Sequence, residues 1–197
     1  PGRSFAEGDV PAEWQPGDTL LDTYTVSGLL GEGGMGKVYR VHHKSWNIDL
    51  AVKSPHPEFF QTQEQCDLFI SEAETWVNLG LHPHIVSCYY VRTLGGIPRV
   101  FAELVEGGSL ADWIEQRKIT SVEQALDIAI QFARAGRHTH LWGRDERQLA
   151  AMQQQRRNAR YLPDAAFPDT LDVAPTLAAA LQGVDDVLVA VPSHAFR

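Results

Sequence analysis

The sequence has few of the residues that mark secreted, metal-binding or membrane-spanning proteins. Its 197 residues include two cysteines, Cys66 and Cys88, which are too few and too far apart for a disulfide framework or a cysteine metal motif. We therefore expect reduced thiols and a cytoplasmic protein. No apolar run approaches the roughly 18 residues that a membrane-spanning helix needs, and the polar first residues lack the apolar core of a signal peptide.

Basic residues are also scarce. The formal net charge is −8, and no cluster of Lys and Arg forms a basic patch, which argues against a nucleic-acid surface. The imbalance is not uniform, because residues 1–135 carry 10 basic and 18 acidic side chains, whereas residues 136–197 carry seven of each. No lysine follows Lys118. This shift in composition indicates a boundary in the second half of the chain.

What the sequence does have is a glycine-rich stretch that continues into a lysine-bearing strand. Its glycines, Gly31, Gly33 and Gly36, follow the pattern G-x-G-x-x-G, and Lys53 comes one strand later. Glycines at this spacing let a backbone turn approach a ligand closely, because no Cβ stands in the way. The glycines alone could form an ordinary loop, but the added lysine favours a phosphate-binding turn.

The residues after the last glycine decide which kind of phosphate site this is. A dinucleotide-binding fingerprint must open a helix there, whereas residues 37–41 alternate and contain β-branched and aromatic side chains, which predicts a strand. A helix over residues 64–80 and two strands over 85–92 and 99–105 follow. This order resembles the small lobe of serine/threonine protein kinases.

The kinase resemblance implies an ATP site, and each role can be assigned to a residue of this chain. The three glycines would cover the phosphates, and Lys53 would hold the α- and β-phosphates. The remaining implied contacts are the adenine pocket (Leu30, Val38, Ala51), the gatekeeper (Ala102), the hinge backbone (Glu103, Val105) and the ribose side (Ser109).

The kinase resemblance also implies a glutamate partner for Lys53 on the helix. Glu72 and Glu74 both flank its apolar stripe, so periodicity does not choose between them. The local pattern around Phe69 favours Glu72, although counting back from His82 disagrees by one residue. We take Glu72 as the partner.

Beyond this point the kinase pattern stops. After a helix capped by Ser121 and Gln124, a kinase would carry His-Arg-Asp, an Asn five residues past that Asp, and later Asp-Phe-Gly, which supply the proton acceptor and the metal ligands. The nearest fragment is Gly143-Arg144-Asp145, and the residue five past Asp145 is Ala150. We expect no kinase activity from this chain alone, and Mg²⁺ only if its ligands are supplied elsewhere.

The last third of the chain has a different pattern. We predict strands over residues 138–143, 171–173 and 187–191, with helices over 146–159 and 176–182 between them, an α/β arrangement. Asp145 and Thr176 are suited to cap the two helices, and Gly183 to end the second. The spacing of His138, His140 and His194 matches no metal motif, so we expect no metal site.

This part resembles the N-terminal region of bacterial NAD(P)-dependent glycerol-3-phosphate dehydrogenase. The resemblance is carried by residues 141–145, 158–163 and 189–194, with Arg197. It implies that Arg144 approaches the adenosine end of a dinucleotide and that Pro192 and Ser193 lie beside the nicotinamide. The first strand and its glycine fingerprint are missing, so we expect no useful binding of NAD(P).

The sequence therefore predicts a composite chain. We expect a flexible lead-in (1–17), an α+β kinase-like small lobe with a twisted, antiparallel five-stranded sheet and a helix (18–106), two large-lobe helices (107–134) and an incomplete Rossmann-like α/β fragment (135–197). The junction, between residues 131 and 142, is either a real fusion or an artefact.

Three functions fit such a chain. The first, favoured by the glycine turn with Lys53, is an ATP-binding kinase homologue that is truncated before its catalytic motifs and inactive. The second is a remnant of the dehydrogenase, and the third is a non-catalytic interaction module. We also expect exposed apolar surface around Phe132, which a protein partner could cover.

Overall fold

The computed structural model describes residues 2–185 and 187, and the chain divides into two compact units, residues 1–107 and 108–197. The described part of the first unit contains a seven-stranded sheet in the order β1-β2-β3-β4-β5-β7-β6. Its strands are β1 (Ser4–Phe5), β2 (Thr19–Leu20), β3 (Tyr24–Gly33), β4 (Gly36–His43), β5 (Ile48–Pro55), β6 (Cys88–Leu94) and β7 (Ile97–Glu103). Strands β3 to β7 pair antiparallel, which confirms the predicted five-stranded sheet.

Side chains alternate along these strands and separate the sheet into two faces. Tyr39, Val52 and Phe101 are cross-strand partners on β4, β5 and β7, and all three are buried. They belong to the main core of the unit, so we call their side the outer face. The side that carries Val38 and Lys53, the next row of partners, is called the open face.

The described part of the lead-in is folded, in contrast to the flexible segment that the sequence predicted over residues 1–17. Val10 and Trp14 are each 3% exposed and belong to the outer-face core. β1 pairs parallel with β2, and a short 3-10 helix, η1 (Glu7–Asp9), follows it. We call residues 2–18 the N-terminal strap. Its Pro, Gly and acidic content indicated disorder, but the apolar side chains within it supply burial that offsets the entropy of ordering.

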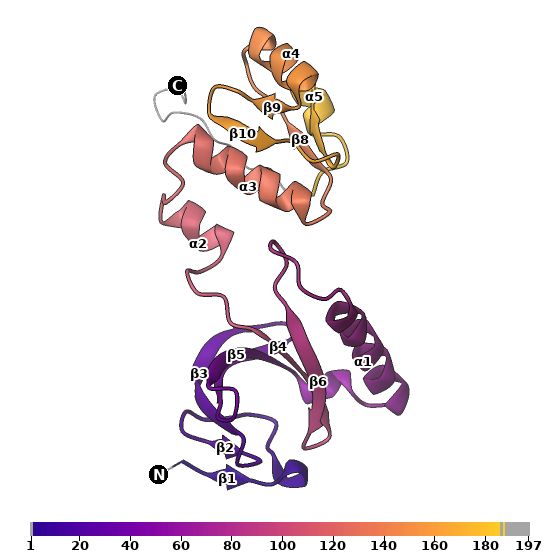
Figure 1. Cartoon of the computed structure of the whole chain (residues 1–197). Helices are drawn as coiled ribbons and strands as arrows, with labels where there is room; N and C mark the ends of the chain where they lie inside the picture. Colours follow the sequence, from indigo (N-terminus) through magenta and orange to yellow (C-terminus); the bar gives the residue numbers. More distant parts are fainter. Residues whose placement is uncertain (1, 186, 188–197) are drawn as a thin grey trace. The chain divides into compact units, whose positions relative to one another are not determined.

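One helix packs on the other end of the sheet. α1 (Gln63–Asn78) begins with a capping box in which the Thr62 side chain accepts from the backbone N–H of Gln65. It lies beside β6 in Figure 1 and contacts both β6 and β7, and Ala73, Cys88 and Val100 form a small buried cluster between them. A 3-10 helix, η2 (Pro57–Phe59), links β5 to α1.

The second unit combines the two helices predicted for a kinase large lobe with the α/β segment. Its elements are α2 (Leu110–Glu115), α3 (Val122–Arg134), β8 (Thr139–Leu141), α4 (Glu146–Gln155), β9 (Arg157–Asn158), β10 (Leu162–Ala166), β11 (Leu171–Val173) and α5 (Leu177–Ala180). β11 pairs parallel with β8, whereas β10 pairs antiparallel with β9. The parallel pair agrees with the predicted Rossmann-like fragment.

Helix α3 supplies one side of the core of this unit. Leu126, Ile130 and Ala133 pack with Leu149 and Met152 of α4, together with residues of the β11 region. The predicted change of family near residue 135 therefore does not coincide with a boundary between compact units, because α3 shares its core with the elements that follow it.

Helix ends in this unit differ in part from the prediction. Asp145 caps α4 as expected, but α4 ends at Gln155 rather than Ala159, because Arg156 adopts a left-handed conformation with φ of 51°. Thr176 caps α5 and Gly183 has φ of 70°. The strand expected over 187–191 lies outside the described residues except for Val187, as do the positions assigned to Pro192, Ser193, His194 and Arg197.

Within the part of the chain that the structure describes, no helix has the length and apolar content of a membrane span.

Candidate functional site

The residues assigned to the phosphates meet on the open face of the first unit. Gly31 of β3 pairs with Val38 of β4, and Val38 pairs with Lys53 of β5. Direct partners on neighbouring antiparallel strands project to the same side. The Lys53 side chain is thus two strands away from Gly31, on the side that also holds Val100 and α1.

The glycines of the turn differ in what requires them. Gly36 has φ of +139°, and a Cβ there would lie 2.3 Å from the carbonyl oxygen of Ser54, so the protein's own backbone demands glycine. Gly31 and Gly33 have φ outside the left-handed region, and a Cβ on either would meet no described heavy atom within 4 Å. Nothing in the described chain explains the choice of glycine at these two positions.

His56 holds the tip of the turn from the side of β5. Its Nε2 lies 3.2 Å from the carbonyl oxygen of Gly33, and its backbone N–H donates to the carbonyl of Met35 at 3.3 Å. The turn is therefore tied to the end of the strand that carries Lys53.

The residues assigned to adenine lie along the same face. Val38 and Ala51 are half-buried, and Ala51 pairs with the buried Ala102 on β7. Leu30, in contrast, is 49% exposed and falls in the register shift of β3 between Leu29 and Gly31. The structure thus brings the β3, β4, β5 and β7 residues of the predicted site together.

Lys53 forms no ion pair with its predicted partner, Glu72, among the described residues. Glu72 and Glu74 are both exposed on α1, and among the described residues no ion pair joins either of them to Lys53. The buried residue of this part of α1 is Ala73, which lies between them. The pairing of Lys53 with Glu72 therefore stays a prediction.

The hinge residues divide between the two units. Glu103 ends β7, where its backbone N–H donates to the carbonyl of Ser87 at 2.9 Å. Val105 is 59% exposed. Ser109 belongs to the second unit, where it caps α2 and its Oγ donates to Asp112 at 2.7 Å. Its assignment to the ribose stays a prediction.

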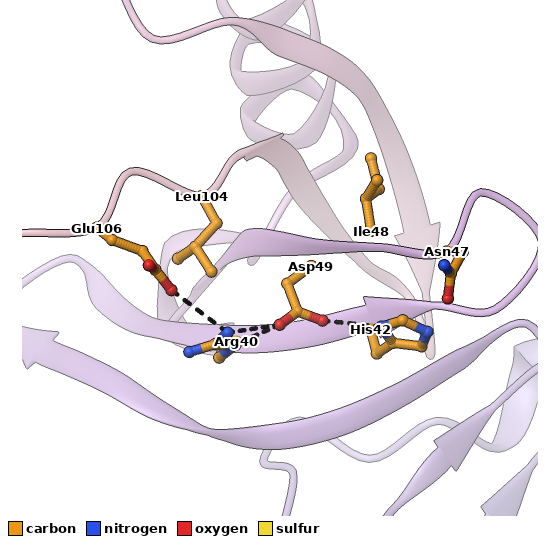
Figure 2. Close-up of a pocket in the computed structure, with 7 residues that line it drawn as sticks. All are labelled: Arg40, His42, Asn47, Ile48, Asp49, Leu104 and Glu106. Atoms are coloured by element: carbon orange, nitrogen blue, oxygen red, sulfur yellow. Dashed lines mark hydrogen bonds and ion pairs between the residues drawn. The ribbon is translucent and has the colours of Figure 1, made fainter.

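A cavity of about 420 Å³ in the first unit was not foreseen (Figure 2). Arg40 and Asp49 line it from β4 and β5, and Arg40 is the cross-strand partner of Ala51, so the cavity continues the row of adenine-assigned residues. Its other lining residues are His42, Asn47, Ile48, Leu104 and Glu106. The sequence did indicate that Arg40 and His42 share a face with Val38, because alternate residues of one strand project to the same side.

Charges in this cavity are paired. Arg40 Nη2 lies 2.6 Å from an Asp49 oxygen and 3.4 Å from Glu106 Oε1, and His42 Nδ1 lies 2.8 Å from the other Asp49 oxygen. The hydrogen bonds from His42 and then Arg40 lower the pKa of Asp49 below its ordinary value of 3.8. Glu106 connects the segment after β7 to this network.

In the second unit, Arg144 is exposed in the turn between β8 and the N-cap of α4. Among the described residues of the chain, no group of three or more His, Cys, Asp or Glu side chains is placed to hold a metal ion.

Comparison with known families gives two matches that overlap. The model of the protein kinase domain matches residues 24–143, and that of the N-terminus of NAD-dependent glycerol-3-phosphate dehydrogenase matches residues 124–197. The overlap, 124–143, contains most of α3 and all of β8. Both resemblances inferred from the sequence are confirmed.

Individual relatives cover only parts of the chain. Glycerol-3-phosphate dehydrogenase [NAD(P)+] of Haemophilus influenzae is 48% identical over 69 residues, which are 35% of this chain and 21% of that protein. The Yersinia pestis enzyme is 52% identical over 69 residues, 35% of this chain and 20% of that protein. A crystal structure of the Mycobacterium tuberculosis PknI kinase domain is 26% identical with a TM-score of 0.52, covering 62% of this chain and 50% of that domain. The chain thus spans about a fifth of these dehydrogenases and half of this kinase domain.

Proposed function

The chain belongs to the protein kinase family through residues 24–143, and from this membership we propose that its first unit binds ATP on the open face of the sheet. The observation that carries the proposal is the open space above Gly31 and Gly33. Neither backbone strain nor crowding by the chain requires glycine there, whereas a phosphate group in close contact with the backbone would. Lys53 lies in the same cross-strand row as Gly31.

Lys53 supplies the charge that such a ligand needs. An ammonium group on a flexible stem acts as a point charge toward phosphate oxygens. In this site it would hold the α- and β-phosphates, with Glu72 of α1 as the carboxylate that orients it. No carboxylate is engaged with Lys53 among the described residues, so we propose that ordering of this pair accompanies nucleotide binding.

The adenine would lie along the row that leads to the cavity of Figure 2. Val38 and Ala51 present apolar surface there, and the backbone groups of Glu103 and Val105 would pair with the ring edge. The cavity begins at Arg40, the partner of Ala51, and gives the site a polar outer end.

Transfer of the phosphoryl group is a separate matter. The chain has neither the His-Arg-Asp nor the Asp-Phe-Gly sequence that supplies the proton acceptor and the metal ligands in kinases. We propose that the chain binds ATP without transferring phosphate, and that Mg²⁺ is held only with ligands from elsewhere. The second unit is not proposed to bind NAD(P), because no glycine fingerprint lies directly before residues 133–136.

The test is a calorimetric titration of the full chain with ATP. Lys53→Ala should weaken ATP binding about tenfold or more, since a charge-assisted phosphate contact contributes roughly 1.5 to 3 kcal/mol. Lys44→Ala is the matched control, because Lys44 is exposed in the turn between β4 and β5. Absence of ATP binding by the unaltered chain would refute the proposal, and phosphotransfer abolished by Lys53→Ala would refute the proposed inactivity.

A further inference from the structure

The N-terminal strap reaches the glycine-rich turn. Glu13 Oε1 lies 2.6 Å from Nζ of Lys37, the residue directly after Gly36, and the Lys37 side chain is only 18% exposed. Lys37 is two residues before Tyr39 on the same strand, so it projects with Tyr39 to the outer face. Val38 and Lys53 project to the opposite face. It therefore contacts the strap and not the proposed phosphate position.

Glu13 is held between two anchored residues. On one side, the backbone N–H of Trp14 donates to the hydroxyl of Tyr39 at 3.3 Å, and the two rings pack with centroids 4.9 Å apart. On the other side, the guanidinium of Arg99 donates to the carbonyls of Pro11 and Ala12 at 2.9 and 3.2 Å. The backbone that carries Glu13 thus has little freedom.

Arg99 links this part of the strap to the strand beneath the turn. It is fully buried, and its Nε donates to Ser54 Oγ at 2.9 Å. Ser54 directly follows Lys53, and its carbonyl is the atom that a Cβ on Gly36 would meet. Hydrogen bonds through Arg99 therefore connect the strap to β5, the strand that carries Lys53 and lies next to the glycine turn.

We propose that Glu13 is a positioning residue for the glycine-rich turn, acting through Lys37. Glu13 restrains the outer side of the turn while His56 contacts its tip from the β5 side, so the turn is held near the position that covers a phosphate. Such preorganisation raises affinity, because less freedom is lost when the ligand binds. The predicted effect on ATP affinity rests on the proposed ATP site, whereas the predicted restraint of the turn does not.

Two measurements on the full chain separate these consequences. Hydrogen exchange of residues 31–37 without nucleotide reports on the turn itself, and an ATP titration reports on binding. In Glu13→Gln we expect exchange in the turn to rise about threefold and ATP affinity to fall by a similar factor, in the range of a partly exposed ion pair. Reversing the pair, with Glu13→Lys and Lys37→Glu together, should restore both in part, because Glu32, whose Oε1 lies 3.8 Å from Lys37 Nζ, would then face a carboxylate instead of an ammonium group.

Glu7→Gln is the matched control, because Glu7 of the same strap pairs with Arg92 on β6 at 3.1 Å, away from the turn. It should leave both measurements unchanged. Unchanged exchange in Glu13→Gln, or an equal effect of Glu7→Gln, would overturn the positioning role. If the unaltered chain binds no ATP, the proposed function fails, while the exchange data still decide whether Glu13 restrains the turn.

Discussion

The two faces of the first unit's sheet are made by alternate residues of the same strands, yet they differ in almost every physical respect. On the outer face, Tyr39 is buried against Trp14 of the N-terminal strap, and the buried Phe101 belongs to the same core. On the open face, Val38, Ala51 and Lys53 are half-buried and lead to a polar cavity. The outer face therefore carries the main core of the unit, whereas the open face, apart from the small cluster under α1, keeps its side chains accessible to a ligand.

This comparison predicts that substitutions on the outer face change stability and those on the open face change binding. The largest effect should come from Arg99→Ala, because the Arg99 side chain is fully buried and donates to Ser54, to Leu94 and to the strap. Burial lowers its pKa to about 10, so the group stays charged at neutral pH and depends on these acceptors. Its loss leaves the buried Leu94 carbonyl and the part-buried Pro11 carbonyl without this donor and should lower the free energy of unfolding by about 3 kcal/mol.

Urea denaturation measures this change. Arg92→Ala is the control, since Arg92 pairs with Glu7 near the surface and should contribute less than about 1 kcal/mol. If Arg99→Ala unfolds no more readily than Arg92→Ala, the strap is not a stabilising layer and the contrast between the faces is wrong.

A smaller effect should distinguish the glycines of the turn. Gly36→Ala places a Cβ against the Ser54 carbonyl at a strained φ and should cost about 2 kcal/mol of stability. Gly33→Ala meets open space and should leave stability unchanged, but it should weaken ATP binding because its Cβ enters the proposed phosphate position. Thermal unfolding and ATP titration of both variants check this, and the opposite pattern would show that Gly33 has a structural role.

Much of the open face could be predicted from the sequence, because its determinants are local. Alternation defined the strands around the turn, and the glycine pattern followed by Lys53 one strand later indicated that they serve the same phosphate. Gly31 and Lys53 do lie in one cross-strand row. The partner of Lys53 could not be settled, since it depends on the rotation of α1 against the sheet, and one turn of helix carries both Glu72 and Glu74.

Most of the outer face could not be predicted from the sequence, because its contacts join residues that are far apart along the chain. Trp14 and Arg99 are 85 positions apart, yet the guanidinium of Arg99 lies 4.6 Å from the Trp14 ring. No pattern within the first 17 residues indicates such a partner, and their composition suggested disorder. The cavity at Arg40 was not predicted, although alternation along the strand placed Arg40 on the same face as Val38. A charged residue on a strand normally faces solvent and so does not indicate a pocket. The end of α4 was misplaced because an arginine, not a glycine, takes the left-handed position.

The smallest predicted effect compares one carboxylate from each side of the sheet. Asp18 ends the strap with its side chain 2% exposed, and Asp49 lies on the open face with its side chain 27% exposed. The pKa of each is lowered from 3.8, for Asp18 first by the Arg3 hydrogen bond and for Asp49 first by His42. A lowered native pKa means that the stabilisation is complete above the unfolded value and is lost as the pH falls through the native one.

Urea titrations at neutral pH and near the native pKa values should therefore show that acid destabilises the chain less once either group is removed. Asp18→Asn should reduce this acid dependence more than Asp49→Asn, because the buried carboxylate is less screened by solvent. Both differences should stay below about 1 kcal/mol, since Arg3 and Arg40 remain partly exposed. Equal effects would mean that the strap does not shield Asp18 in solution, and the distinction between the outer and the open face would then be limited to their apolar residues.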